Sequence, residues 1–197
     1  MSPFHHPTVK CHHPTSVSWT ANSDKSSAVG TPGHCGKEPR VAQLKVESSS
    51  FGSNQTIPKK YAFSDWGVGG DNVSPNLKWS GAPAGTKSFV VTIWDPDAPT
   101  TVGYWHWLVF NIPANVTELQ EGNVPAGAVQ GYTDYGMSAY GGPAPPPGDS
   151  PHHYRHRVFA LDVDKLPLEK GTTGATLMFM MRGHILAEGE LVGLFSR

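Results

Sequence analysis

The chain has 197 residues, of which 38% are hydrophobic and 16% charged, and its net charge is −1 at pH 7. This is the composition of a globular domain with a sizeable core, and the near-zero charge argues against nucleic acid as a partner. The sequence has no run of about 18 apolar residues, so no transmembrane segment is expected. Because the start lacks an apolar leader and both cysteines, Cys11 and Cys35, precede residue 41, we expect a cytoplasmic protein without a disulfide framework.

Residues 1–40 are rich in His, Ser, Thr, Pro and Gly and show no periodic spacing of apolar side chains. Too few apolar residues are present to offset the entropy lost on ordering, so we predict a disordered extension. A separate hypothesis makes this segment a loose site for Zn²⁺ or Ni²⁺, although the spacing matches no standard zinc finger. Its candidate ligands are His5, His6, Cys11, His12, His13, His34 and Cys35.

Residues 41–197 are predicted to form one domain, which begins with an imperfect strand over 41–46 and a short strand over 77–79. Residues 87–94 (KSFVVTIW) are continuous, apolar and β-branched, which predicts a buried strand. The next strand, over 104–112, carries four side chains at alternate positions that should share one face, namely Tyr104, His106, Leu108 and Phe110.

The last third of the chain contains a Gly/Pro loop over 141–151, a strand over 153–163, a helix over 175–186 and a closing strand over 188–195. The helix should bury one stripe, made by Leu177, Met181 and His184 or Ile185. In the strand before it, Val158, Ala160 and Asp162 should lie opposite Phe159 and Leu161. Several strands with one late helix predict a mainly β fold, an antiparallel β-sandwich with a few short helices.

Asp95 and Asp97 directly follow the buried strand, in the segment DPDAP. As an i, i+2 pair at a strand end, they should point both carboxylates to one side. Three roles are open for them. They are turn residues that accept backbone N–H bonds, ligands of a metal ion, or groups that orient a histidine.

His106 lies between Trp105 and Trp107 inside the predicted strand. Burying an imidazole among aromatic rings costs free energy unless a partner bonds it. Asp95 ends the preceding strand and is the expected partner. The alternative is a histidine with a purely structural role.

Gly141, Gly142 and Pro143 open the Gly/Pro loop, and His152 and Tyr154 follow it. Glycines let backbone N–H groups approach an anion, and prolines lower the entropy cost of ordering the loop on binding. His152 and Tyr154 form an i, i+2 pair and can face the same cavity. The alternative is a rigid surface crossover without a ligand.

Six segments stand in a specific order and spacing: NVSPNLKWSGAPAGTKSFVV (72–91), DPDAP (95–99), WHW (105–107), YGGPAPPPGDSPHHY (140–154), VFALDV (158–163) and MRGHILAEGELVGLFSR (181–197). Each is weak alone, but the combination resembles the phosphatidylethanolamine-binding protein family, and most closely its microbial, Raf-kinase-inhibitor-like branch. The resemblance covers residues 42–197. Residues 1–40 have no counterpart in it, and Tyr104 and Trp105 depart from its better-known eukaryotic members.

The resemblance implies a β-sandwich with a small anion pocket at one end. Such pockets bind the phosphate-bearing head groups of phospholipids, phosphorylated residues or small anions, and members of the family inhibit kinases or serine proteases. Some relatives are homodimers. We therefore expect a lipid-binding, regulatory protein with no catalytic residue, metal or cofactor. By position in the motifs, the ligand-binding residues implied are Asp95, Asp97, His106, Gly142, Pro143, His152 and Tyr154.

An enzyme is the alternative, in the form of a metal- or histidine-assisted hydrolase of phosphate esters that uses the same aspartates and histidines. The sequence has no G-x-S-x-G motif and no cysteine after residue 35, which favours binding. Carboxylates repel a phosphate dianion, so the site requires charged histidines or a phosphate proton that bridges to an aspartate oxygen. We expect His106 and His152 to titrate near neutrality, so binding should weaken as pH rises.

Overall fold

The computed structural model describes residues 41–197. The disordered extension and the metal site predicted for residues 1–40 lie outside this part of the chain. Among the described residues no helix is long and apolar enough to cross a membrane. The elements are β1 (Ala42–Gln43), β2 (Lys45–Glu47), β3 (Gln55–Thr56), η1 (Lys59–Tyr61), β4 (Leu77–Ser80), β5 (Ser88–Asp95), β6 (Tyr104–Pro113), β7 (Glu118–Leu119), β8 (Val129–Gln130), β9 (His152–Leu161), α1 (Gly174–Met181) and β10 (Ile185–Phe195).

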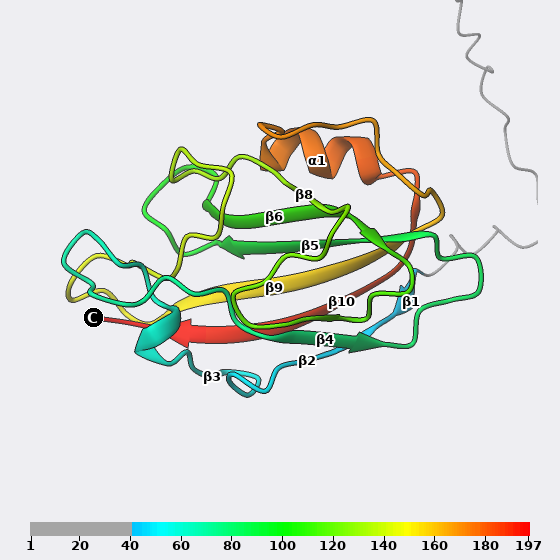
Figure 1. The fold of residues 1–197 in the computed structure, drawn as a ribbon. Coiled ribbons are helices and arrows are strands. Elements are labelled where there is room, and N and C mark those ends of the chain that lie inside the picture. The colour runs from blue at the N-terminus through cyan, green and yellow to red at the C-terminus, as the bar shows by residue number, and fades with distance from the viewer. Residues whose placement is uncertain (1–40) are drawn as a thin grey trace, which may run out of the picture. The chain divides into compact units, whose positions relative to one another are not determined.

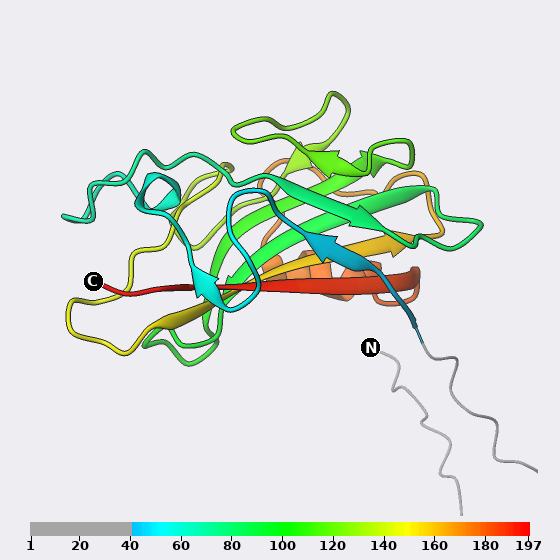
Figure 2. The same ribbon diagram turned by 90° about the horizontal axis from the view of Figure 1, so that it is seen from below.

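Two sheets form the fold. The larger sheet has seven strands in the order β1-β10-β9-β5-β6-β8, with β3 also paired to β10, and the smaller has the order β2-β4-β7. Neighbouring long strands are antiparallel, and only the short β1 and β3 run parallel to β10. Helix α1 lies against one face of the larger sheet and β2 and β4 lie on the other side, as Figure 1 shows and Figure 2 repeats from below. The predicted mainly β sandwich with a few short helices is confirmed.

The predicted first strand is two strands in different sheets. β1 pairs with β10 in the larger sheet, whereas β2 pairs with β4 in the smaller one. Leu44 lies between them, and its side chain is buried in the core that both sheets share. The chain thus passes from one layer to the other within a few residues, which explains why the alternation over residues 41–46 is imperfect.

Strand β6 contains two β-bulges that change which side chains share a face. Ile93 pairs with Trp107 and Trp94 with Trp105, so His106 is an extra residue in β6. A second irregularity falls before Ile112, where Asn111 has a φ of +58°. A bulge puts two consecutive side chains on nearly the same face of a sheet.

The prediction of one shared face in β6 is therefore wrong. Leu108 and Phe110 pack in the cluster beneath α1. Tyr104 and His106 line a cavity on the other side of the sheet. The position of a bulge cannot be predicted from apolar periodicity alone. The inserted residue breaks the period-2 pattern without changing the composition of the strand.

Two apolar clusters cover the two faces of the larger sheet. The one between the sheets includes Trp79, Phe89, Trp107 and Val158, and the one under α1 includes Val90, Phe159, Leu161, Leu177 and Met181. The alternation predicted for residues 158–161 is confirmed by this division, since even and odd positions fall in different clusters.

Helix α1 is shorter than predicted. It begins after Thr173, whose side chain accepts a hydrogen bond from the backbone N–H of Thr176, and ends at Met181. The next residues turn through Gly183, and β10 already begins at Ile185. The apolar run could continue as helix or strand, and pairing with β9 decides in favour of the strand.

Strand pairing brings distant parts of the chain together at one end of the larger sheet. Trp94, near the end of β5, pairs with Arg155 near the start of β9 and with Trp105 near the start of β6. The loop that follows β5 and the loops that precede β6 and β9 therefore lie at this same end of the sheet (Figure 1).

Candidate functional site

A cavity of about 420 Å³ opens at this end of the larger sheet. Its floor comes from β5, β6 and β9, and its walls come from the loops that follow β5 and precede β9, with Trp66 and Tyr135 from two further loops. The lining residues are Trp66, Asp95, Ala98, Pro99, Thr100, Tyr104, His106, Tyr135, Ala144, Pro145, Pro146, Pro147, His152, Tyr154 and Arg197.

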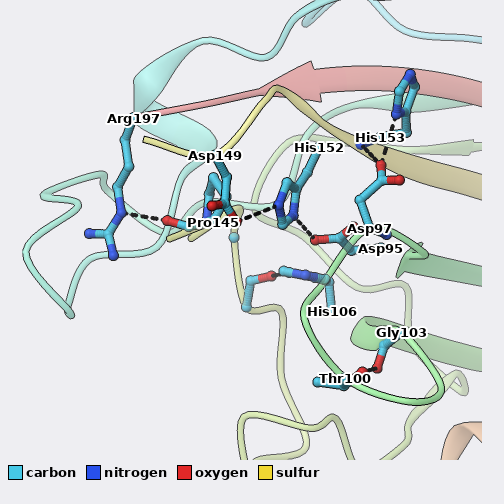
Figure 3. Close-up of polar contacts among 12 residues, drawn as sticks. Asp95, Asp97, Thr100, Gly103, His106, Pro145, Asp149, His152, His153 and Arg197 are labelled. Atoms are coloured by element: carbon cyan, nitrogen blue, oxygen red, sulfur yellow. Dashed lines mark hydrogen bonds and ion pairs between the residues drawn. The ribbon is translucent and has the colours of Figure 1, made fainter. Parts of the chain in front are cut away.

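His152 is held between two carboxylates. Its Nδ1 lies 2.7 Å from Oδ2 of Asp95, and its Nε2 lies 3.3 Å from Oδ2 of Asp149 (Figure 3). Asp95 and His152 are 2% and 4% exposed, so the first contact is fully buried, whereas Asp149 is partly open to solvent. Both ring nitrogens face carboxylate oxygens, and only an imidazolium can donate to both.

His106 has a backbone partner and not the expected Asp95. Its Nδ1 lies 2.8 Å from the carbonyl oxygen of Gly141, which can only accept, so Nδ1 carries the proton. The ring is 3% exposed and packs edge-on against Tyr154 and Tyr135. Burial lowers the pKa of His106, and the opposing effects of Gly141 and Asp95 do not restore it. The pKa of His106 therefore lies below the ordinary value that the expectation of titration near neutrality assumed.

Asp97 does not point into the cavity. Its Oδ2 accepts hydrogen bonds from the backbone N–H of His153 and from the ring of the same residue, on the outer side of β9 (Figure 3). Partial burial alone would raise the pKa of Asp97, but the bonds from His153 outweigh it and the pKa is lowered. The prediction that the carboxylates of Asp95 and Asp97 point to the same side is therefore wrong. Because the chain turns at Pro96, Asp95 faces His152 and Asp97 faces His153. The backbone N–H of Asp97 donates a hydrogen bond to Oδ1 of Asp95.

Gly142 and Pro143 shape the cavity without lining it. The N–H of Gly142 donates to the side chain of Asn72, and the carbonyl of Pro143 accepts from Phe63. A Cβ on Gly142 would lie 2.2 Å from the carbonyl oxygen of Tyr61. The glycine is required here for close approach of two backbone segments and not for backbone contact with an anion.

Tyr154 presents an unpaired hydroxyl. The residue is 1% exposed, and within residues 41–197 its buried Oη has no hydrogen-bond partner. A buried hydroxyl without a partner costs free energy. Trp79 Nε1 and Thr92 Oγ1 are unpaired in this part of the chain as well, but of these three residues Tyr154 alone lines the cavity. His152 precedes it by two residues and lines the same cavity.

Aromatic side chains that the sequence does not single out form one wall. Tyr135 packs against Trp66 and Tyr104 with ring centroids 5.0 and 5.1 Å apart. Trp66 is 54% exposed and has a φ of +51°, a conformation that costs a non-glycine residue about 1–2 kcal/mol. An exposed tryptophan in the Gly-rich turn 64–70 is the signal that could have identified this wall.

Arg197 joins two loops at the mouth of the cavity. Its Nε donates to the carbonyl of Pro145 across 2.5 Å (Figure 3). Its Nη1 donates to the carbonyl of Trp66 across 2.7 Å. It also brings the one cationic side chain of the Lys or Arg type among the described residues that line the cavity. Arg197 ends the segment 181–197, but nothing in that segment assigns it to the cavity, because its role depends on where β10 ends relative to loops far away in the sequence.

The residues considered as metal ligands do not converge. Among residues 41–197 no group of three or more His, Cys, Asp or Glu side chains has a spacing suited to a metal ion. Asp97 turns outward to His153, and Nδ1 of both His106 and His152 is engaged by the protein itself. The cavity is therefore built from hydrogen-bonding and aromatic groups around one buried carboxylate.

Comparison with known proteins gives consistent matches over the part of the chain that forms this fold. Residues 47–196 match the family described as phosphatidylethanolamine-binding protein. The UPF0098 protein YbcL of Escherichia coli K12 is 42% identical over 164 residues, which cover 80% of this chain and 90% of YbcL. YbhB of the same organism is 41% identical over 78% of this chain and all of its own length.

Solved structures of similar proteins have the same fold as this chain. The crystal structure of E. coli YbcL, described as a new member of the mammalian PEBP family, superposes with a TM-score of 0.77 and covers 79% of this chain and 99% of its own. A phosphatidylethanolamine-binding protein homologue from Chlamydia trachomatis is 36% identical and has a TM-score of 0.70, covering 79% of this chain and 98% of its own. These matches span nearly the whole of both solved structures and about four fifths of this chain.

Proposed function

The chain belongs to the phosphatidylethanolamine-binding protein family, and on this premise we propose that its cavity binds the phosphate group of a phospholipid head group or of a related small phosphate monoester. The polar groups that would contact the phosphate are His106 and Tyr154, beside His152, whose two ring nitrogens are held by Asp95 and Asp149. Arg197 adds positive charge at the mouth. Trp66 and Tyr135 offer apolar surface to the rest of the ligand.

One observation carries this proposal, namely the buried hydroxyl of Tyr154 that has no partner in the described residues. Tyr154 lines a cavity whose other polar groups, His106 and His152, are held by hydrogen bonds to Gly141 and Asp95. Preorganised hydrogen-bonding groups around a small space favour recognition of a small phosphate ligand, because little entropy is then lost on binding.

The test is a titration of the full chain with O-phosphorylethanolamine, followed by amide NMR, with inorganic phosphate as the comparison ligand. We expect saturable shifts around Asp95, His106, His152 and Tyr154. The polar groove on the outer face of β9 and β10, made by Arg155, Arg157, Glu188 and Glu190, serves as the internal control and should not respond.

Larger shifts with phosphorylethanolamine than with phosphate would support head-group binding, and the reverse would support a generic oxyanion site. An absence of shifts at millimolar ligand would refute the proposal. Inhibition of a kinase or protease, the homodimer, the cytoplasmic location and the phosphate-ester hydrolase remain predictions, since no contact in residues 41–197 bears on them.

A further inference from the structure

The protein supplies more hydrogen-bond acceptors than free donors to the cavity. Oδ2 of Asp95 already accepts from His152, and Oδ1 accepts from the backbone of Asp97. The ring of His152 is engaged at both nitrogens, on one side by Asp95 and on the other by Asp149. The hydroxyls of Tyr104 and Tyr135 donate to the carbonyls of Asp134 and Gly142, which leaves them as acceptors toward the cavity.

His106 adds another acceptor. Because Nδ1 donates to the carbonyl of Gly141, the neutral ring has its lone pair on Nε2. The ring is buried and lines the cavity, and no hydrogen bond to its Nε2 is found among residues 41–197. An unprotonated oxyanion placed against this nitrogen would meet lone pair with lone pair. Tyr154 differs, since its unpaired hydroxyl can donate.

We propose that the cavity selects oxyacids that carry one proton, so that the ligand donates an O–H to Nε2 of His106 and accepts the O–H of Tyr154. This rests on the proposed function and specifies the form of phosphate that is bound. A phosphate monoester as the monoanion has both groups. A sulfate monoester has the same shape but no proton to donate at neutral pH, so it lacks the first bond and faces the lone pair of His106.

The groups around His106 keep this arrangement through the neutral range. Burial raises the pKa of Tyr135 and Tyr154 and also of Tyr104 on the same strand, so all three stay protonated. His156, from β9, has its pKa lowered to about 4 by burial. The charged neighbours of His106 are Asp95 at the end of β5 and Asp134 from the loop before Tyr135, and they only partly oppose the effect of burial.

The ligand therefore sets the pH dependence. A phosphate monoester loses its second proton near pH 6, and above that pH the fraction of monoanion falls roughly tenfold for each pH unit. The sequence-based expectation of weaker binding at higher pH is kept, but its origin moves from the charge of His106 to the proton of the ligand.

The experiment compares 2-aminoethyl phosphate with its isostere 2-aminoethyl sulfate on the unmodified full chain, by calorimetry at about pH 5.5 to 8. We expect the phosphate ester to bind at least about tenfold more tightly at the acid end, and its advantage to shrink as pH rises. The sulfate ester should bind weakly with no pH dependence of its own. Long-range ¹H–¹⁵N NMR of His106 should show Nδ1 protonated, with Nε2 shifting only when the phosphate ester binds.

Equal affinity for the two esters, or an affinity for the phosphate ester that does not change with pH, would overturn this inference and leave the proposed function standing. No binding of either ester would refute the proposed function, and the inference with it. As a second measurement, His106→Phe removes the acceptor and should bring the phosphate ester to the affinity of the sulfate ester. A variant that retained the preference for phosphate would contradict the role of Nε2.

Discussion

Asp95 and His152 form a buried hydrogen bond across 2.7 Å, although 57 residues separate them in the sequence. The pair forms because β5 and β9 are neighbours in the larger sheet, so that the residue after Trp94 reaches the strand that starts at His152. Removing the carboxylate leaves the buried imidazole without its closest partner.

We expect Asp95→Ala to lower the free energy of unfolding by about 3 kcal/mol, because a buried group loses its charged partner. The matched control is Asp162→Ala, which breaks a pair of the same chemistry between Asp162 and His184 where both side chains are exposed by more than two fifths. That variant should lose at most about 1 kcal/mol. Urea unfolding measures both, and equal losses would show that the Asp95 pair is no more important to stability than a surface pair.

Tyr154→Phe should separate binding from stability. Its hydroxyl has no partner in the described residues, so its removal should leave the unfolding free energy unchanged or raise it by up to about 1 kcal/mol. Affinity for 2-aminoethyl phosphate should fall about tenfold, the value of one lost hydrogen bond to an anion.

The control for that change is Tyr140→Phe. Tyr140 is also buried, but its hydroxyl donates to the carbonyl of Tyr61. This variant should lose about 1–2 kcal/mol of stability and keep its affinity. The opposite pattern, in which Tyr154→Phe destabilises and binds normally, would mean that the Tyr154 hydroxyl has a structural partner.

Stability should fall at acid pH because of His156. Burial holds its pKa at about 4, below the ordinary value of 6.5, although the hydrogen bond to the backbone carbonyl of Tyr154 opposes this shift. Between these values the unfolded chain binds a proton that the folded chain does not. The stability contributed is therefore complete above about pH 6.5 and decreases by roughly 3 kcal/mol as pH falls to about 4.

His156→Asn keeps a donor for the carbonyl of Tyr154 and removes the titration. The difference in unfolding free energy between about pH 7 and 4.5 should be smaller in this variant than in the unmodified protein. His184→Asn, at an exposed position, should retain the full pH dependence. If His156→Asn retains it as well, the acid sensitivity arises elsewhere.

Gly142→Ala should destabilise the cavity wall. The added Cβ would fall 2.2 Å from the carbonyl oxygen of Tyr61 and 2.5 Å from the carbonyl carbon of Ala62, and backbone atoms cannot move aside as a side chain can. We expect a loss of about 2–3 kcal/mol in urea unfolding. Gly183→Ala is the control, since a Cβ added there would have no neighbour within 4 Å and the change should be nearly neutral. Similar effects at both sites would indicate that the loop has room to shift.

Arg197→Lys should test whether geometry or charge matters at the mouth of the cavity. Lysine keeps the charge but cannot donate in a fork to the carbonyls of Pro145 and Trp66. We expect the affinity for 2-aminoethyl phosphate, measured by calorimetry, to fall by roughly threefold to tenfold because the two loops are no longer held together. Arg182→Lys, away from the cavity, should leave it unchanged. Full affinity in Arg197→Lys would show that charge alone suffices.

The parts of the fold that follow simple patterns could be predicted from the sequence. The strands at 88–95, 104–113 and 152–161 appear as continuous or alternating apolar runs, and the split of Val158 from Phe159 follows from the pleat alone. The predicted helix is too long because the apolar residues around Ile185 are compatible with either a helix or a strand. Only the long-range pairing of β10 with β9 decides between them.

The site is predictable where residue type and motif coincide, and not where tertiary geometry decides. Asp95, His106, His152 and Tyr154 line one cavity, but Asp97 turns to the outer face after a proline, and Gly142 is needed for close backbone packing. Trp66, Tyr135 and Arg197 are not assigned from the sequence, because each reaches the cavity from a loop or strand end whose place in the fold depends on contacts distant in the sequence.

The extra residue at position 106 divides β6 into a part that lines the cavity and a part that packs in the two cores. Beyond it, Trp107 and Leu108 pack in the two cores, whereas Tyr104 before it lines the cavity. Substitutions at the start of β6 can therefore change what the cavity accepts without disturbing the register of the sheet. Ligand preference can diverge between relatives while the scaffold is inherited unchanged, and β6 is the place to look for that divergence.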